Sequence, residues 1–318
     1  MSESVRPPSL PPPPSGRPPP PDPAERQHTV AAEDGTRLYV RTMPARHPEH
    51  KLGISTVFCD GILCDGFIWK YLWKGIAEVC DVAHWHYRGH GRSGAPVDKA
   101  RIDIGAHATD LKTVRDDLGD KPCVLIGHSM GTQVALEEWR RYPKNVKGIV
   151  LICGSYGKVT HSFRGVPILD MILPKLMDIV DKQPDIVRAI WSRIPPEVAL
   201  KAALLARDVD PSNVRREDML PYLKHMTHVD FPMFLRMLRA AGDHSAEEWL
   251  GEVDVPVLVI AGEKDTFTPA SLSEAMAERI PNAELLMVSG GSHVAPIEQP
   301  ELVGARIRAF VERVASTT

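Results

Sequence analysis

The chain has 318 residues, of which 43% are hydrophobic and 25% charged, and its formal net charge is −3. These values are ordinary for a globular protein, and they give no reason to expect nucleic acid or an anionic membrane surface as a partner. No stretch approaches the roughly 18 apolar residues of a membrane span, and the N-terminus lacks the apolar core of a signal peptide. The five cysteines, an odd number, lie mostly in predicted strands. We therefore expect buried free thiols in a cytoplasmic protein, without a disulfide framework or a metal site.

The first 27 residues are dominated by proline, with runs at 11–14 and 18–21. Such a segment cannot bury an apolar face, so residues 1–27 are predicted to be a disordered or polyproline tail. Its P-x-x-P spacing leaves weak contacts with a proline-reading domain open, although a passive tail is the simpler interpretation.

From residue 28 onward, strand and helix patterns alternate. Two short runs around an Asp-Gly turn predict a hairpin, and the patterns that follow predict buried strands each succeeded by a helix. Alternation of this kind favours a doubly wound, mostly parallel α/β sheet. The predicted strands are 29–32, 37–42, 54–59, 82–86, 123–126, 148–153, 255–261 and 283–288, and the predicted helices are 67–79, 106–118, 130–142, 270–280 and 301–315.

The alternation stops near Gly154 and resumes only at 255–261. The intervening stretch has helical patterns, including one that Asp230 would cap and Gly242 would end. We therefore predict a helical cap, residues 157–247, inserted between two parts of an α/β core, residues 28–156 and 248–318.

The sequence Gly127-His128-Ser129-Met130-Gly131 stands between a predicted strand and a predicted helix. This is the G-x-S-x-G pattern of a nucleophile elbow in the context that the motif requires. The glycines permit a turn so sharp that a Cβ at either flanking position would collide with its neighbours. The turn raises the Ser129 hydroxyl above the sheet edge and directs the Met130 N–H, at a helix N-terminus, toward the same place.

A serine hydroxyl needs a general base to become a nucleophile, and the base needs a carboxylate to orient it. Asp265 follows one late predicted strand and His293 follows the next, so these two residues are the candidates. Glu263, His128 and His90 are the weaker alternatives: strand alternation should turn Glu263 away, His128 should pack below the serine, and His90 belongs to a turn motif.

The order Ser129, Asp265, His293 resembles that of the α/β-hydrolase superfamily. The likeness covers residues 28–318 and is carried by the elbow and three further motifs. They are Arg88-Gly89-His90-Gly91-Arg92-Ser93, Gly262-x-x-Asp265-x-x-x-Pro269 and His293-x-x-x-x-Glu298-x-Pro300.

The resemblance also implies an oxyanion hole. Its second donor should come from the loop after strand 54–59, which normally reads His-Gly-x and here reads Asp60-Gly61-Ile62. The donors would then be the N–H groups of Ile62 and Met130. Relatives usually carry aspartate where this chain has His86. We therefore expect Asp60 and His86 to form a hydrogen-bonded pair in which aspartate and histidine have exchanged the positions that they occupy in relatives. This pair would hold the loop in place.

These features predict a serine hydrolase that cleaves a carboxylic ester with an apolar acyl or alcohol group, through an acyl-enzyme on Ser129 and without a cofactor. A serine nucleophile argues against haloalkane dehalogenase and epoxide hydrolase chemistry, which uses aspartate on this fold. Lactone hydrolysis, carbon–carbon bond hydrolysis and cofactor-free perhydrolysis use the same triad and stay open, as does a non-catalytic ligand-binding relative. Substrate identity and oligomeric state are left undetermined.

Overall fold

The computed structural model describes residues 22–159, 168–195, 197–198 and 214–317. Its eight strands form one sheet in the order β1-β2-β4-β3-β5-β6-β7-β8. The strands are β1 (Arg26–Ala31), β2 (Arg37–Met43), β3 (Ser55–Cys59), β4 (Asp81–Trp85), β5 (Cys123–His128), β6 (Val146–Ile152), β7 (Val257–Gly262) and β8 (Ala283–Val288). β1 and β2 pair antiparallel to their neighbours and the remaining pairs are parallel. The prediction of a mostly parallel α/β sheet is confirmed.

Helices cover both faces of this sheet, because alternate residues of each buried strand point to opposite sides. One apolar layer includes residues of α2, α3 and α10, and the other includes residues of α1 and α12. The core helices are α1 (Leu72–Ala77), α2 (Ile104–Asp117), α3 (Met130–Arg141), α10 (Ala270–Arg279), α11 (Ala295–Glu298) and α12 (Pro300–Ser316), with 3₁₀ turns η1 (Pro48–His50), η2 (Phe67–Trp69) and η4 (Leu250–Glu252).

The predicted Asp-Gly hairpin turn is present between β1 and β2. The N–H of Ala32 donates to the carbonyl of Thr36 over 2.8 Å, and Gly35 has a φ of 83°, which suits glycine. β1 begins at Arg26, two residues before the predicted start of the core at 28. Residues 1–21, most of the predicted proline-rich tail, lie outside the described residues.

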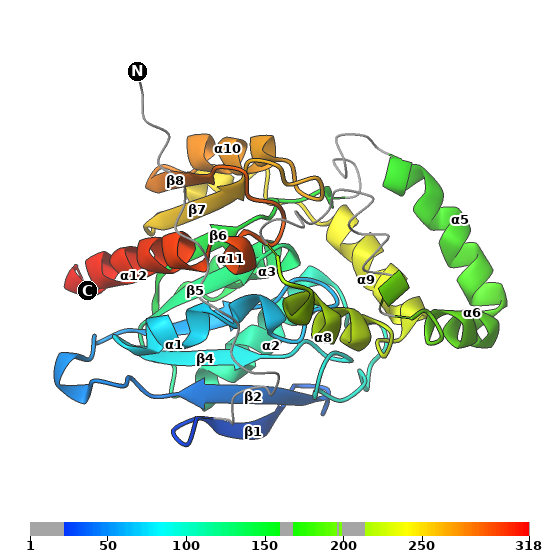
Figure 1. Cartoon of the computed structure of the whole chain (residues 1–318), viewed down its shortest axis with the longest axis horizontal. Coiled ribbons are helices and arrows are strands. Elements are labelled where there is room, and N and C mark those ends of the chain that lie inside the picture. Colours follow the sequence, from blue (N-terminus) through cyan, green and yellow to red (C-terminus); the bar gives the residue numbers. More distant parts are fainter. Residues whose placement is uncertain (1–21, 160–167, 196, 199–213, 318) are drawn as a thin grey trace.

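The insertion between β6 and β7 is helical where the structure describes it. Its helices are α5 (Ile168–Lys182), α6 (Pro184–Trp191), α8 (Arg216–Met226) and α9 (Phe231–Asp243), which lie together to one side of the sheet (Figure 1). Asp230 caps α9 as predicted, because its side chain accepts a hydrogen bond from Met233 N over 2.9 Å. The predicted end at Gly242 is wrong: the helix continues to Asp243, and Gly242 is buried inside its last turn.

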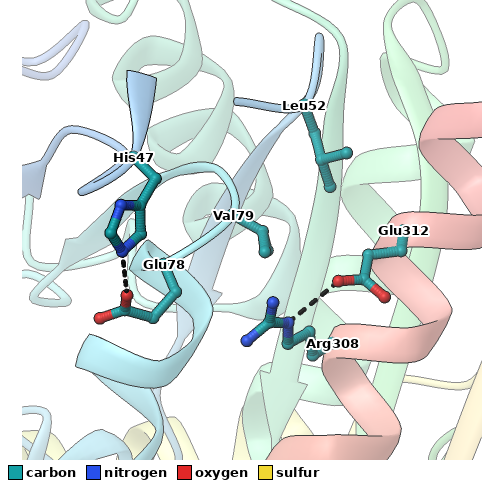
Figure 2. A pocket seen from close by; sticks show the side chains of 6 residues that line it. All are labelled: His47, Leu52, Glu78, Val79, Arg308 and Glu312. Atoms are coloured by element: carbon teal, nitrogen blue, oxygen red, sulfur yellow. Dashed lines mark hydrogen bonds and ion pairs between the residues drawn. The ribbon is translucent and has the colours of Figure 1, made fainter. Parts of the chain in front are cut away.

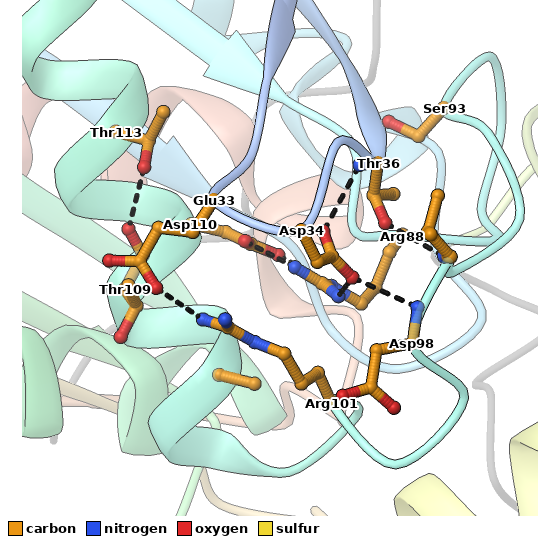
Figure 3. A network of polar contacts seen from close by, with 12 residues as sticks. Glu33, Asp34, Thr36, Arg88, Ser93, Asp98, Arg101, Thr109, Asp110 and Thr113 are labelled. Carbon is orange, nitrogen blue, oxygen red and sulfur yellow. Dashed lines mark hydrogen bonds and ion pairs between the residues drawn. The ribbon is translucent and has the colours of Figure 1, made fainter.

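A buried arginine joins three segments beside β4 (Figure 3). The guanidinium of Arg88 donates two hydrogen bonds to the carboxylate of Asp110 on α2, over 2.8 and 2.6 Å, and one to Asp34 over 2.8 Å. Asp34 lies in the turn between β1 and β2 and also accepts from the N–H of Asp98. These hydrogen bonds hold the loop after β4 against both the hairpin and α2. Separating the segments would leave the buried guanidinium without its carboxylates, which would cost free energy of folding.

Figure 2 shows a groove of about 530 Å³ that is remote from the nucleophile elbow at the carboxyl end of β5. Leu52 and Val79 in its lining precede β3 and β4, so the groove lies at the amino ends of these strands. Its remaining lining residues are His47, Glu78, Arg308 and Glu312, of which His47 contacts Glu78 at 3.0 Å and Arg308 contacts Glu312 at 2.9 Å. Both carboxylates of the groove have an arginine partner, since Glu78 also pairs with Arg46 at 3.3 Å.

All five cysteines are buried and free. No helix within the described residues is both long enough and apolar enough to cross a membrane.

Candidate active site

Ser129 lies in a sharp turn between β5 and α3, with φ 55° and ψ −120°. This backbone conformation is rare for a residue with a side chain and is tolerated where the surroundings enforce it. A Cβ on Gly127 would lie 2.2 Å from the Gly131 carbonyl oxygen, and one on Gly131 would lie 2.3 Å from that of Cys59. Both flanking glycines are therefore required by close packing, as the elbow motif predicts.

The carboxylate of Asp265 and the imidazole of His293 are in contact. Asp265 follows β7, His293 follows β8, and His293 Nδ1 lies 2.9 Å from Asp265 Oδ2. Because β7 and β8 are parallel neighbours, their carboxyl ends bring the two loops together at one edge of the sheet. The structure thus brings together two residues that are 28 positions apart in the sequence.

Asp265 is nearly buried and is held by a local turn. Its Oδ1 accepts hydrogen bonds from the N–H groups of Phe267 and Thr268, each over 2.9 Å, and its Oδ2 accepts from the Thr268 hydroxyl over 2.8 Å. Burial raises the pKa of this carboxyl, but the adjacent His293 and the Thr268 hydrogen bonds outweigh it, so the pKa lies below the ordinary value. Asp265 is therefore an ionised partner for the imidazole at neutral pH.

The histidine lies against the elbow. The carbonyl of His293 is 2.9 Å from His128 Nε2, and the two rings have centroids 4.9 Å apart. Glu298 holds the loop that carries His293: its carboxylate accepts hydrogen bonds from the N–H and the hydroxyl of Ser292 over 2.6 and 2.7 Å. With Nδ1 facing Asp265, Nε2 is the ring nitrogen free for proton transfer. Neither Nε2 nor the Ser129 hydroxyl has a hydrogen-bond partner among the described residues; in enzymes without substrate, such contacts are often long.

The loop after β3 packs directly on this elbow. A Cβ on Gly61 would lie 3.1 Å from Ser129 Cβ and 3.2 Å from His128 Nδ1. Ile62 follows in the same loop, and Met130 begins α3, so the two expected oxyanion donors belong to segments in van der Waals contact. Neither N–H donates a hydrogen bond within the part of the chain that the structure describes, and both are free to receive an acceptor.

The expected pairing of Asp60 with His86 is wrong. Asp60 Oδ2 lies 2.9 Å from Nε2 of His84, and Asp60 Oδ1 accepts from the indole N–H of Trp69 over 2.7 Å. His86 instead accepts from the N–H of Arg92 through Nδ1. Alternation places both His84, which lies on β4 opposite Phe58, and His86, two residues later, on the face of Asp60. Their contacts separate them: His86 follows the strand end and its Nδ1 accepts from Arg92, whereas Nε2 of His84 faces the carboxylate.

The three weaker candidates for catalytic roles all have other contacts. His128 is buried with its Nε2 engaged by the His293 carbonyl, and burial lowers its pKa to about 3, so both its contacts and its low basicity argue against it as the base. Glu263 is exposed and accepts from the hydroxyl of Ser289 and the N–H of Gly290. His90 is buried with Nδ1 facing the Arg88 carbonyl.

A family model described as serine aminopeptidase, S33 (Hydrolase_4), matches residues 77–300, which include the elbow and the Asp265–His293 pair. The chain belongs to this family of α/β hydrolases.

Individual relatives agree with this assignment. Over 223 residues, 69% of the chain, it is 28% identical to a Pseudomonas savastanoi pv. phaseolicola protein named "Putative carbamate hydrolase RutD", of which the match covers 79%. Among solved structures, an esterase from Exiguobacterium antarcticum superposes with a TM-score of 0.70 at 20% identity, covering 89% of this chain and 98% of that one. The enol-lactonase of Burkholderia xenovorans LB400 gives 0.71 at 19%, covering 90% and 100%. These two show the fold.

Sequence reasoning missed three residues that support this α/β-hydrolase site. Thr268 could have been found from a local signal, since an acidic residue followed by threonine three positions later forms a hydrogen-bonded turn. His84 and Trp69 have none, because they reach Asp60 through strand pairing and through the packing of η2. Among the described residues, no group of three or more His, Cys, Asp or Glu side chains is arranged to hold a metal ion.

Proposed function

We propose that this α/β hydrolase cleaves carboxylic esters through an acyl-enzyme on Ser129. The observation that carries the proposal is the buried, ionised Asp265 paired with His293 directly against a strained serine elbow. A strained turn, a base and an orienting carboxylate at one sheet edge are the parts that serine acyl transfer needs.

The reaction proceeds in two halves. Ser129 Oγ attacks the ester carbonyl carbon while His293 Nε2 takes its proton, and the imidazolium that forms is stabilised by Asp265. The carbonyl oxygen becomes an anion that accepts hydrogen bonds from the N–H groups of Ile62 and Met130; each such donor contributes about 2.7–4 kcal/mol to the transition state. The alcohol leaves with the proton from His293. Water then attacks the acyl-enzyme, His293 takes a proton from it, and the carboxylic acid and the free Ser129 hydroxyl are released.

The apolar character of the substrate is supported by the side chains where the helical insertion meets the core. Phe67 stacks on Tyr222 of α8, with ring centroids 4.1 Å apart. Met233 of α9 packs so closely on Gly89 that a Cβ there would lie 2.5 Å from its sulfur. A methionine and aromatic rings suit an acyl or alcohol group that is not itself polar.

A carbamate is a second candidate substrate, favoured by the relative RutD. Lactones are a further candidate substrate class for the same three residues.

Five buried free thiols support a reducing compartment such as the cytoplasm.

The test is covalent labelling with a fluorophosphonate, followed by peptide mapping, in the wild type and in Ser129→Ala. We expect modification of Ser129 in the wild type and none in the variant. The control is Ser273→Ala, because Ser273 is a buried serine whose hydroxyl has no hydrogen-bond partner in the described chain and which lies outside the elbow. Hydrolysis of p-nitrophenyl esters of rising chain length, of a lactone and of an aryl carbamate then orders the substrate classes. A folded wild type that is neither labelled nor active on any of them would refute the proposal.

A further inference from the structure

Four side chains that none of the catalytic roles requires form a continuous hydrogen-bonded chain ending at the oxyanion loop. Arg41 on β2 and His84 on β4 are directly opposite each other in the antiparallel pair, and Phe58 on β3 is opposite His84 in the parallel pair. Asp60, two residues after Phe58, therefore lies on the same sheet face. Trp69 packs on Phe58 in a tilted arrangement, with ring centroids 4.8 Å apart, and its indole N–H reaches Asp60.

The direction of each hydrogen bond follows from the two groups that can only donate, the guanidinium of Arg41 and the indole N–H of Trp69. Arg41 Nε donates to His84 Nδ1 over 3.1 Å, so this nitrogen must be the acceptor of a neutral imidazole. His84 Nε2 then carries the hydrogen and donates to Asp60 Oδ2 over 2.9 Å. Burial lowers the pKa of His84 well below its ordinary value, in agreement with the neutral form.

This arrangement gives each carboxylate oxygen of Asp60 its own donor. Trp69 donates to one oxygen and His84 donates to the other. Arg41 donates to the second ring nitrogen of His84, so that its positive charge acts on Asp60 through the imidazole. An unpaired carboxylate next to an oxyanion hole would repel the developing negative charge. In Asp60 each oxygen accepts a hydrogen bond and an arginine compensates the charge. The side chain is therefore held in one position and can fix the loop that follows it.

The backbone of Asp60 connects this chain to the nucleophile elbow. Its carbonyl accepts a hydrogen bond from the Tyr87 hydroxyl over 2.7 Å, and a Cβ on Gly131 would lie 2.7 Å from the same oxygen. Gly61, the next residue, packs against Ser129. A shift of the Asp60 side chain is therefore transmitted to the Ile62 N–H, two residues further along.

We propose that Arg41, His84 and Trp69 are positioning residues, which act through Asp60 to hold the Ile62 N–H in register with the Met130 N–H. The inference rests on the proposed acyl-enzyme function. It predicts that breaking the chain lowers transition-state stabilisation and leaves substrate binding unchanged.

The sharpest test is Trp69→Phe, which keeps an aromatic ring but removes the donor to Asp60. Its matched control is Trp73→Phe: Trp73 is equally buried, packs on the same Phe58 at 5.9 Å, and its indole N–H has no partner among the described residues. Arg41 lies over the Trp73 ring, and phenylalanine keeps an aromatic face there. Both variants lose the same volume. Trp69 differs from Trp73 in its hydrogen bond to Asp60 and in an edge-on contact with the His128 ring, with centroids 6.2 Å apart, so the Arg41 variants below separate the hydrogen-bonded chain from that ring contact.

We expect kcat for a p-nitrophenyl ester to fall between about 10-fold and 100-fold in Trp69→Phe with KM unchanged, and to stay near wild type in Trp73→Phe. The inhibition constant of a trifluoromethyl ketone, whose adduct carries the oxyanion, should rise by the same factor as kcat falls. A loss of fold alone would not produce this proportionality. Equal kinetics in the two tryptophan variants would overturn the inference.

A second variant covers the case in which Trp69→Phe does not fold. Arg41→Met should reproduce the kcat defect, and Arg41→Lys, which keeps the charge and a donor, should restore part of the activity. Wild-type kinetics in Arg41→Met would also overturn the inference. Failure of the proposed function is seen separately, as a wild type that the fluorophosphonate does not modify at Ser129.

Discussion

Gly131→Ala places a single methyl group between the elbow and the oxyanion loop. The added Cβ would lie 2.3 Å from the carbonyl oxygen of Cys59 and 2.7 Å from that of Asp60, whereas ordinary contacts begin at 3.4 Å. Both neighbours are backbone atoms at the end of β3, so no flexible side chain can move aside. The loop must therefore move away from α3 by about 1 Å.

The consequences for stability and for activity differ in size. Overpacking costs about 1–3 kcal/mol, and the higher helix propensity of alanine returns up to about 1 kcal/mol, so the free energy of unfolding should fall by at most about 3 kcal/mol. A displacement of about 1 Å between catalytic groups costs roughly 100-fold in rate, which is about 2.7 kcal/mol. We expect kcat/KM to fall roughly 100-fold in a protein that is still folded at 25 °C.

Urea unfolding and p-nitrophenyl acetate hydrolysis measure the two quantities. The control is Gly75→Ala in α1, where the new Cβ meets no atom within 4 Å. That change should stabilise the protein by about 0.5–1 kcal/mol and leave activity unaltered. The reasoning fails if Gly131→Ala retains both the stability and the kcat/KM of the wild type, since the close contact would then be relieved without moving the loop.

Three further outcomes are expected. Thr268→Val removes a hydroxyl donor from Asp265 and should cost about 1–3 kcal/mol at pH 7. Because the folded pKa of Asp265 lies below its ordinary value of 3.8, this contribution is present above that pH and is lost as the pH falls through the folded pKa. Urea unfolding followed from pH 7 down to about pH 2 should therefore show the difference from wild type narrowing below pH 3.8, and a difference that stays constant over this whole range would contradict the assignment. Arg88→Met leaves Asp34 and Asp110 buried without their cation and should lower the free energy of unfolding by about 3–5 kcal/mol, measured from the urea midpoint; a loss below about 1 kcal/mol would argue against this network. The five buried cysteines should be unreactive toward Ellman's reagent in the native protein and all react in guanidinium chloride, whereas rapid native reaction would show an exposed thiol.

The sequence alone determined the features that depend on local pattern. Strand and helix alternation predicted the doubly wound sheet, and the glycines flanking Ser129 predicted the elbow, because hydrophobic period and turn chemistry are local properties. The positions of Asp265 and His293 after two late strands predicted their meeting, since parallel strands end at one edge.

What the sequence could not determine is which side chain meets which across strands that are distant in the chain. Asp60 was matched to His86 by its motif position. Alternation places His84 and His86 on one face, and only the packed structure shows that His84 meets the carboxylate while His86 accepts from Arg92. Arg41 and Trp69 reach the same cluster from an edge strand and a 3₁₀ turn. These contacts depend on pairing order and packing, which are set only when the whole sheet assembles, so the tertiary structure alone decided how the oxyanion loop is held.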